Sequence, residues 1–83
     1  MKVAVRYFAS VREALGPGES IEVGPGATVG VVRDALIARD AAHAAALHRG
    51  RAVRSALDQV LCDEDAVVGE GAEIGFFPPV TGG

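Results

Sequence analysis

The residues of this chain with the clearest chemical potential stand at its C-terminal end, Val80-Thr81-Gly82-Gly83. A glycine has no Cβ, so other groups can approach its backbone closely. Two glycines leave the terminal carboxyl unhindered, and we expect the carboxyl of Gly83 to be the functional group, with Gly82 clearing the approach. A frayed end without a role is the alternative that a diglycine alone leaves open.

The other candidates for chemistry are weaker. The single cysteine, Cys62, cannot form an internal disulfide or a cysteine metal cluster, and we expect a buried small residue on a strand. His43 and His48 lie five residues apart, a spacing that does not place two imidazoles side by side on a helix, so we expect both on the surface. No nucleophile and base pair can be assembled, and we expect no metal site and no catalysis by the chain alone.

Three polar segments are interpreted as surface structure. Gly24-Pro25-Gly26 lacks the lysine and hydroxyl residue of a phosphate-binding loop and is predicted to be a turn. Asp63-Glu64-Asp65 lacks the glycine-centred spacing of a calcium loop and is predicted to be a solvated turn. We expect Arg49, Arg51 and Arg54 in a solvated loop, with contact to an acidic partner as the alternative.

Length and composition describe one small globular domain. Its 83 residues are 49% hydrophobic and 23% charged, which is typical of folded domains. A domain this small has little room for a large internal pocket, so a substrate site is expected to be shared with a partner. The net charge of -3 argues against nucleic acid, and no segment resembles a signal peptide or a membrane span. We expect a cytoplasmic protein without nucleic-acid or membrane partners.

Hydrophobic periodicity predicts an α+β fold, with a sheet covered on one face by helical material. The predicted strands span residues 2–8, 20–23 and 73–77, and residues 53–62 are extended with a break near Asp58-Gln59. The predicted helix caps are Ser10, Thr28 and Asp40. Val29, Val32 and Leu36 form the apolar stripe of the main helix. Whether the helical region after Thr28 is one bent helix or two stays open.

Strand parity predicts a core face and an open face of the sheet. The expected core-facing residues are Val3, Val5, Tyr7, Ile74 and Phe76. Phe8 and Phe77 then point the other way, and on an uncovered face they would form a partner hot spot with Arg6 or Arg12 at its rim. A position of one or both rings under a loop is equally compatible with the pattern.

Two segments carry a resemblance to a known family: Tyr7-Phe8-Ala9-Ser10-Val11-Arg12-Glu13 and Phe76-Phe77-Pro78-Pro79-Val80-Thr81-Gly82-Gly83. They resemble the small, sulfur-carrying subunits of molybdopterin synthase, which are ubiquitin-like β-grasp proteins. The resemblance covers the whole chain in length and in the order of elements. Its specific part is the closing octapeptide, since ubiquitin and the thiazole-pathway carrier share the diglycine. Asp58 before Gln59 departs from the family, where asparagine is frequent.

The resemblance implies a β-grasp domain over residues 1–77, built from a mixed sheet of four to five strands with one main helix on one face, and a flexible tail over residues 78–83. It implies that a ubiquitin-activating-type adenylyltransferase uses ATP to adenylate Gly83, and that a sulfur donor protein then displaces AMP to leave a thiocarboxylate. The large subunit of a heterotetramer would receive this sulfur for cyclic pyranopterin monophosphate, and this chain would bind no cofactor stably. The expected partner-binding residues are Phe8, Arg12, Leu61, Phe77, Pro78, Pro79, Val80 and Thr81.

Three alternatives stay open at this point. The chain could be a protein modifier that forms isopeptide bonds to lysines, as ubiquitin does. It could carry sulfur for another pathway, such as thiazole or cysteine synthesis. It could also be a plain interaction domain whose tail is inert.

Overall fold

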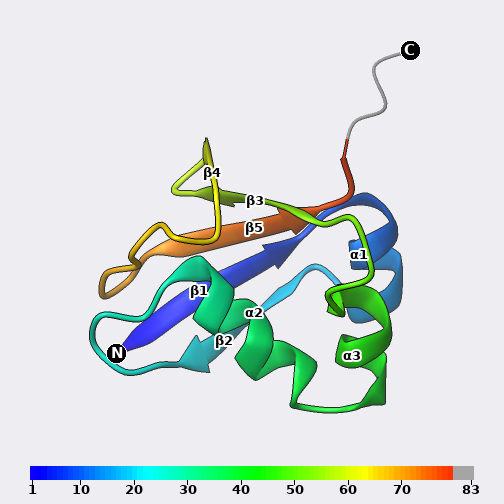
Figure 1. Ribbon diagram of the computed structural model, residues 1–83, viewed down its shortest axis with the longest axis horizontal. Helices are drawn as coiled ribbons and strands as arrows, with labels where there is room; N and C mark the ends of the chain where they lie inside the picture. Colours follow the sequence, from blue (N-terminus) through cyan, green and yellow to red (C-terminus); the bar gives the residue numbers. More distant parts are fainter. Residues whose placement is uncertain (80–83) are drawn as a thin grey trace.

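The computed structural model describes residues 1–79, which form a mixed sheet of five strands and three helices (Figure 1). The elements are β1 (Lys2–Tyr7), α1 (Ala9–Leu15), β2 (Gly18–Glu22), α2 (Val29–Ile37), α3 (Ala41–Leu47), β3 (Arg54–Leu57), β4 (Val60–Cys62) and β5 (Glu73–Phe77). The strand order is β2-β1-β5-β3-β4, with β1 and β5 parallel and the other neighbours antiparallel. The predicted α+β class is confirmed.

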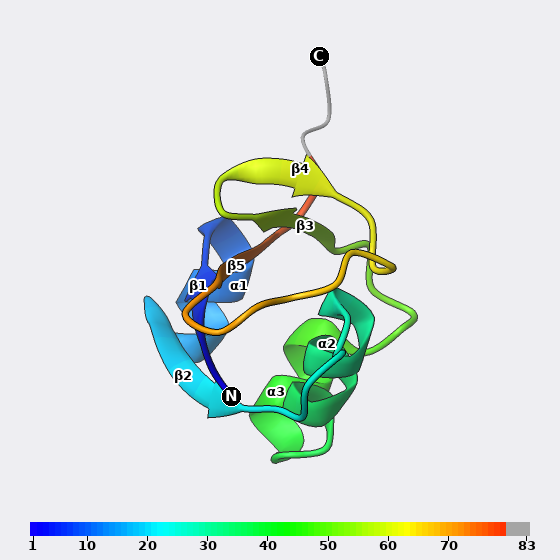
Figure 2. The same cartoon turned by 90° about the vertical axis from the view of Figure 1, so that its left-hand side faces the viewer.

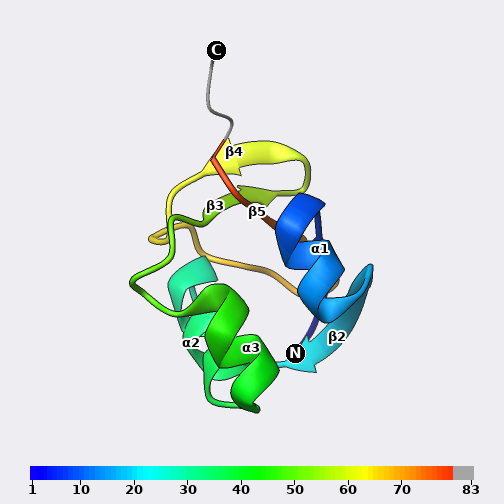
Figure 3. The ribbon, with the colours of Figure 1, turned by 90° about the vertical axis from the view of Figure 1, so that its right-hand side faces the viewer.

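The sheet curves around α2 and α3, which lie on one of its faces, while α1 lies beside the end of β1 (Figures 2 and 3). The predicted core-facing residues are each at most 1% exposed: Val3, Val5, Tyr7, Ile74 and Phe76. They pack against the apolar stripe of α2, where Val29, Val32 and Leu36 are fully buried. Each such side chain contributes about 1.5–3 kcal/mol through burial. No helix of the described residues covers the opposite face of the sheet, which we call the open face.

The helical region after Thr28 contains two helices, which settles the alternative that the sequence left open. Thr28 caps α2 by accepting a hydrogen bond from the Val31 amide at 3.2 Å, and Asp40 caps α3 by accepting one from the His43 amide at 2.8 Å. Both predicted caps are confirmed. The predicted cap at Ser10 is wrong, because α1 already begins at Ala9 and its N-cap, Phe8, makes no side-chain cap.

The predicted break at Asp58-Gln59 is the turn of the β3–β4 hairpin. Both residues have positive φ angles, 49° and 69°, as a two-residue turn with the twist of the flanking strands requires. The Asp58 carboxylate also accepts a hydrogen bond from the Glu73 amide at 3.0 Å. The hairpin is therefore attached to the start of β5.

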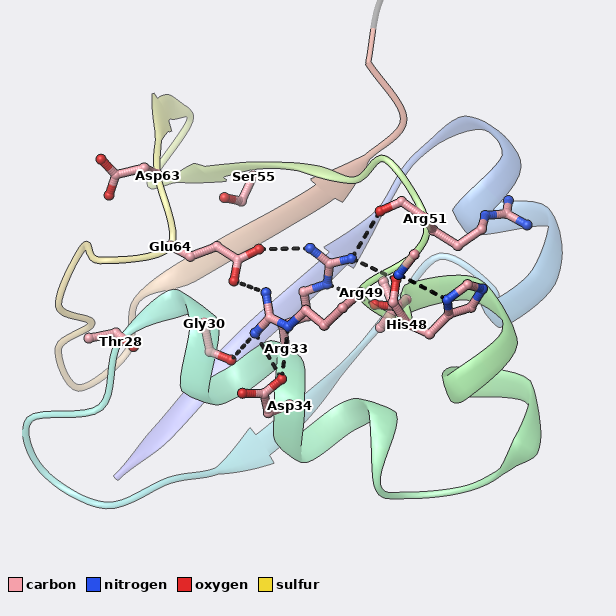
Figure 4. Close-up of polar contacts among 12 residues, drawn as sticks. Thr28, Gly30, Arg33, Asp34, His48, Arg49, Arg51, Ser55, Asp63 and Glu64 are labelled. Carbon is pink, nitrogen blue, oxygen red and sulfur yellow. Dashed lines mark hydrogen bonds and ion pairs between the residues drawn. The ribbon is translucent and has the colours of Figure 1, made fainter.

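A buried arginine joins α2 to the segment that follows α3 (Figure 4). Arg33 is 4% exposed and donates hydrogen bonds to the backbone oxygens of Leu47, His48 and Arg51 at 2.7 to 3.2 Å. It also pairs with the Glu64 carboxylate at 2.7 Å. These contacts satisfy carbonyls that the end of α3 leaves without helical partners.

Glu64 and Arg49 belong to the same network. Arg49 is exposed in a turn, as expected, and it also pairs with Asp34 at 2.8 Å and with Glu64, and donates to the Gly30 carbonyl at 3.2 Å. Glu64 lies in the expected turn, but it is half-buried between the guanidinium groups of Arg33 and Arg49. Burial alone would raise the pKa of Glu64, but hydrogen bonds from these arginines outweigh it and lower the pKa.

Replacing Arg33 should destabilise the fold. We expect Arg33→Ala to lower the free energy of unfolding by about 3 kcal/mol, because buried carbonyl groups lose their donor and Glu64 loses one cationic partner. Chemical denaturation of both proteins measures the difference. Arg12→Ala, at an exposed arginine, is the control and should change stability by less than about 0.5 kcal/mol. Equal losses for both variants would contradict the assigned role of Arg33.

Candidate functional site

The end of β5 places the start of the predicted tail beside the open face. β5 lies between β1 and β3, so both of its edges are paired. Pro78 and Pro79 follow and are half-buried, and proline cannot donate to a strand ladder, so pairing stops there. The predicted roles of Val80, Thr81, Gly82 and Gly83 lie outside the described residues.

Apolar side chains gather on the open face beside this end of β5. Ala56 is opposite both Gly75 and Leu61 in the strand register, so these three residues share one face. Phe77, two residues after Gly75, is on that face as well. We call Phe8, Leu61 and Phe77, together with Ala56 and Gly75, the open-face patch. Leu61 is 64% exposed, Phe8 is 42% exposed and Phe77 is half-buried.

The ring of Phe8 lies against the backbone of Gly75. A Cβ at Gly75 would come within 3.1 Å of Phe8 Cε2, so the missing side chain makes room for the ring. The Phe8 amide also donates a hydrogen bond to the Phe76 carbonyl at 3.1 Å. Phe8, which follows β1, therefore lies against β5 on the open face, and its outward position agrees with the prediction from strand parity.

Two arginines were expected at the rim of this surface. Arg6 lies on the open face but is engaged by Glu73 on β5, with a nitrogen to oxygen distance of 3.7 Å. Arg12 is exposed on α1. Ala56 and Gly75 could not be predicted as part of this surface, because the pairing of β3 with β5 places them beneath the patch and no local pattern signals that pairing. Val60, which is 67% exposed on the edge strand β4, is a further apolar residue that no sequence pattern indicated.

The described residues contain no group of three His, Cys, Asp or Glu side chains placed to hold a metal ion. Cys62 is half-buried rather than buried as expected, because β4 is the edge of the sheet. The Ser55 hydroxyl lies 3.8 Å from its sulfur. His48 is exposed, as expected, and accepts a hydrogen bond from the Gly50 amide.

His43 was expected on the surface, and this prediction is wrong. Its side chain is 9% exposed and lies between two carboxylates, with Nδ1 2.7 Å from Asp40 and Nε2 2.7 Å from Glu19. Glu19 also accepts a hydrogen bond from the buried Tyr7 hydroxyl at 2.6 Å and pairs with Arg39. We call these five residues the His43 cluster. No local sequence pattern indicates this cluster, because its members come from β1, β2, α3 and the segment before α3.

The cluster changes the pKa of its members. Burial alone would lower the pKa of His43, but hydrogen bonds to Glu19 and Asp40 outweigh it and raise the pKa. Burial and the hydrogen bond to Glu19 raise the pKa of Tyr7. Burial would raise the pKa of Glu19, but hydrogen bonds from Tyr7 and His43 dominate and lower it. The two carboxylates therefore favour the protonated imidazole of His43, which joins β2 to α3.

Comparison with known proteins places this arrangement in a family. The ThiS family matches residues 5–83, a span that begins within β1 and includes the open-face patch and the diglycine. The chain belongs to the ThiS family. Two known proteins are similar to this chain over nearly their whole length. The molybdopterin synthase sulfur carrier subunit of Escherichia coli is 36% identical over 98% of this chain and 99% of its own. The protein of the same name from Haemophilus influenzae is 38% identical over 95% and 96%.

Solved structures agree with this ThiS-family assignment. The small archaeal modifier protein 1 of Haloferax volcanii superimposes with a TM-score of 0.78 at 25% identity, covering 95% of this chain and 98% of its own. A chain from the protein-protein complex of subunits 1 and 2 of the molybdopterin-converting factor of Helicobacter pylori superimposes with a TM-score of 0.68 at 26% identity and full coverage of both chains. The predicted β-grasp fold is thus confirmed.

The His43 cluster predicts how stability depends on pH. Because the pKa of His43 is raised in the folded state, the protonated imidazole stabilises the fold fully below the unfolded pKa of about 6.5. This stabilisation is lost as the pH rises through the folded pKa. We therefore expect the stability difference between the native protein and His43→Gln to shrink as the pH rises above about 6.5 and through the raised pKa of the folded state. Urea unfolding at several pH values measures it. His48→Gln is the control at an exposed histidine, and a His43→Gln difference that stays constant or grows with pH would contradict the prediction.

Proposed function

We propose that this protein is the sulfur-carrier subunit of molybdopterin synthase, with sulfur carried on Gly83. The observation that carries this proposal is the near full-length similarity to proteins of that name. Two features of the chain support it: a closing Phe-Phe-Pro-Pro-Val-Thr-Gly-Gly sequence and an exposed apolar patch at the strand from which this segment continues. Because the similarity extends over 98% of the chain, the proposal concerns the whole domain and not the diglycine alone.

The proposed chemistry begins with activation of the Gly83 carboxylate. A carboxylate is a poor acyl donor, because its leaving group would be oxide. An activating enzyme would transfer AMP from ATP to a carboxylate oxygen and release pyrophosphate. Hydrosulfide released from a donor protein would then attack the carbonyl carbon and displace AMP, which leaves a thiocarboxylate. The thiocarboxylate sulfur would form a bond to cyclic pyranopterin monophosphate, and water would hydrolyse the resulting thioester, which leaves the sulfur on the substrate and returns the Gly83 carboxylate. Two such transfers would complete the dithiolene that binds molybdenum.

The segment after β5 suits delivery of this group to another protein. Six residues from Pro78 to Gly83 span about 20 Å when extended, which is enough to enter a buried site in a partner. The two prolines restrict the backbone and so reduce the entropy that ordering the segment would cost. Glycines at positions 82 and 83 leave the carbonyl accessible to AMP, sulfur and substrate. In this proposal the domain binds the partner, and the segment extends the Gly83 carboxyl into the partner's site.

The proposed partners are the large subunit, an adenylyltransferase and a sulfur donor protein. The Helicobacter pylori complex of subunits 1 and 2 supports the first of these. We propose a heterotetramer with the large subunit, and a cytoplasmic location with no nucleic-acid or membrane partner. Within residues 1–79, no helix has the length and hydropathy needed to cross a membrane.

A second candidate function is attachment to other proteins. The similarity in fold to a small archaeal modifier protein favours it. In that case the activated Gly83 would be attacked by a lysine amine, which releases AMP and forms an isopeptide bond. Such conjugates would persist under reducing agents and would spread over many target proteins.

The reactive end can be tested by mass spectrometry. After incubation with the activating enzyme, ATP and a sulfur source, we expect the intact protein to gain the mass difference between sulfur and oxygen, located in the C-terminal peptide. A variant with one residue added after Gly83 is the control and should gain nothing while unfolding like the native protein. Full sulfur loading of that variant, or none of the native protein, would refute the role of Gly83.

The open-face patch should contribute to partner affinity. We expect Phe77→Ala to weaken binding to the large subunit by about 2 kcal/mol, because a half-buried aromatic ring at the centre of an interface is a typical hot spot. Isothermal titration calorimetry measures the affinity. Val31→Ala removes a 50% exposed apolar side chain on α2, away from the patch, and is the matched control. A large loss of folding stability with unchanged affinity for the large subunit would show that Phe77 stabilises the fold and does not contribute to binding.

A further inference from the structure

The arginines of this domain divide into two groups. Four of them are engaged by carboxylates within the domain: Arg6 by Glu73, Arg33 by Glu64, Arg39 by Glu19, and Arg49 by Asp34 and Glu64. The other three make no ion pair with any of residues 1–79 and are exposed: Arg12, Arg51 and Arg54. Their charges are therefore available to another molecule.

These three arginines lie at the end of the sheet where β5 ends. Arg54 is directly opposite Phe77 in the register, so its side chain emerges on the open face beside the patch. Arg12 is in α1, which begins directly after β1, and its amide donates to the Phe8 carbonyl. Arg51 lies just before β3, in the segment that joins α3 to this strand (Figure 4). The cationic end, as we call Arg12, Arg51 and Arg54, thus flanks the root of the C-terminal segment.

Acidic side chains lie at the opposite end of the sheet. Glu22 is opposite Lys2 at the start of β1, and Glu70 accepts a hydrogen bond from the Lys2 amide. Asp58 accepts one from the Glu73 amide at the start of β5. All three acidic residues are exposed. A domain with a net charge of -3 therefore presents the arginines without an ion pair among residues 1–79 at one end of the sheet and exposed carboxylates at the other, where Glu22 pairs with the N-terminal amine at 3.5 Å and Lys2 is the other cation.

This separation has consequences for docking. An acidic surface would attract the cationic end and repel the far end, so it would orient the domain with the C-terminal segment leading. Glu13, next to Arg12 on α1, offsets one of the three positive charges and leaves the cationic end net positive. An apolar patch alone contributes affinity but has little directional preference at a distance.

We propose that the subunit that receives the C-terminal segment carries acidic side chains around its entrance, and that these face Arg12, Arg51 and Arg54. This inference rests on the proposed function and adds the chemistry of the partner surface to it. The apolar contact holds the docked domain, while the charges select the orientation in which the Gly83 end enters first. The charges should therefore act mainly on the association rate.

The test is the association rate with the purified large subunit, measured by stopped-flow fluorescence at several salt concentrations. Arg54→Glu and Lys2→Glu change the net charge equally, but at opposite ends of the sheet. We expect Arg54→Glu to slow association about tenfold at low salt. The rates should converge near 1 M salt, where the screening length falls to about 3 Å. Lys2→Glu should slow association by less than about twofold.

Arg51→Glu provides a second variant at an exposed turn and should also slow association, whether or not Arg54→Glu folds. Thermal unfolding of each variant verifies that the fold is retained. Equal slowing by Lys2→Glu, or native rates for both arginine variants, would overturn this inference and leave the proposed function intact. A native protein that does not bind the large subunit at all would overturn both.

Discussion

The pairing of β5 between β1 and β3 is the constraint on which the rest of the structure depends. The last strand in the sequence is the central strand of the sheet, hydrogen-bonded along both edges. Ile74 and Phe76 lie in the core, and Phe77 lies on the open face. A segment that follows such a strand starts from one of the best-anchored positions in the domain, which suits a group that must reach into another protein. The domain is already ordered before it docks, so binding does not have to offset the conformational entropy lost when the domain folds.

The two faces of the sheet have different tasks. One face is filled by Tyr7, Phe76 and the apolar stripe of α2, and these contacts hold the fold. The other keeps Leu61 and Phe8 exposed, and the contact of Phe8 with Gly75 joins β1 to β5 within the patch. Since adjacent strand residues point to opposite faces, the same strands supply both surfaces without competition between stability and binding.

Charge is divided in a similar way. The Arg33 network and the His43 cluster place charged groups in contact with one another and join helices to strands at positions where apolar packing ends. These charges are used within the molecule. The arginines without partners among the described residues are located at the end of β5, where the proposed docking takes place. The net charge of the chain conceals this distribution, because it sums groups that lie at opposite ends of the sheet.

The sequence by itself determined the α+β class, the limits of most strands, the caps at Thr28 and Asp40, the core parity of Tyr7 and Phe76, and the outward positions of Phe8 and Phe77. These features depend on local periodicity and on the conformational preferences of neighbouring residues, which the sequence records directly. Only the tertiary structure decided the position of His43 between two carboxylates, the burial of Arg33, the inward position of Glu64 and the row formed by Gly75, Ala56 and Leu61. Each of these joins residues that are distant in the sequence, and their interaction energy exists only after strand order and helix packing have brought them together.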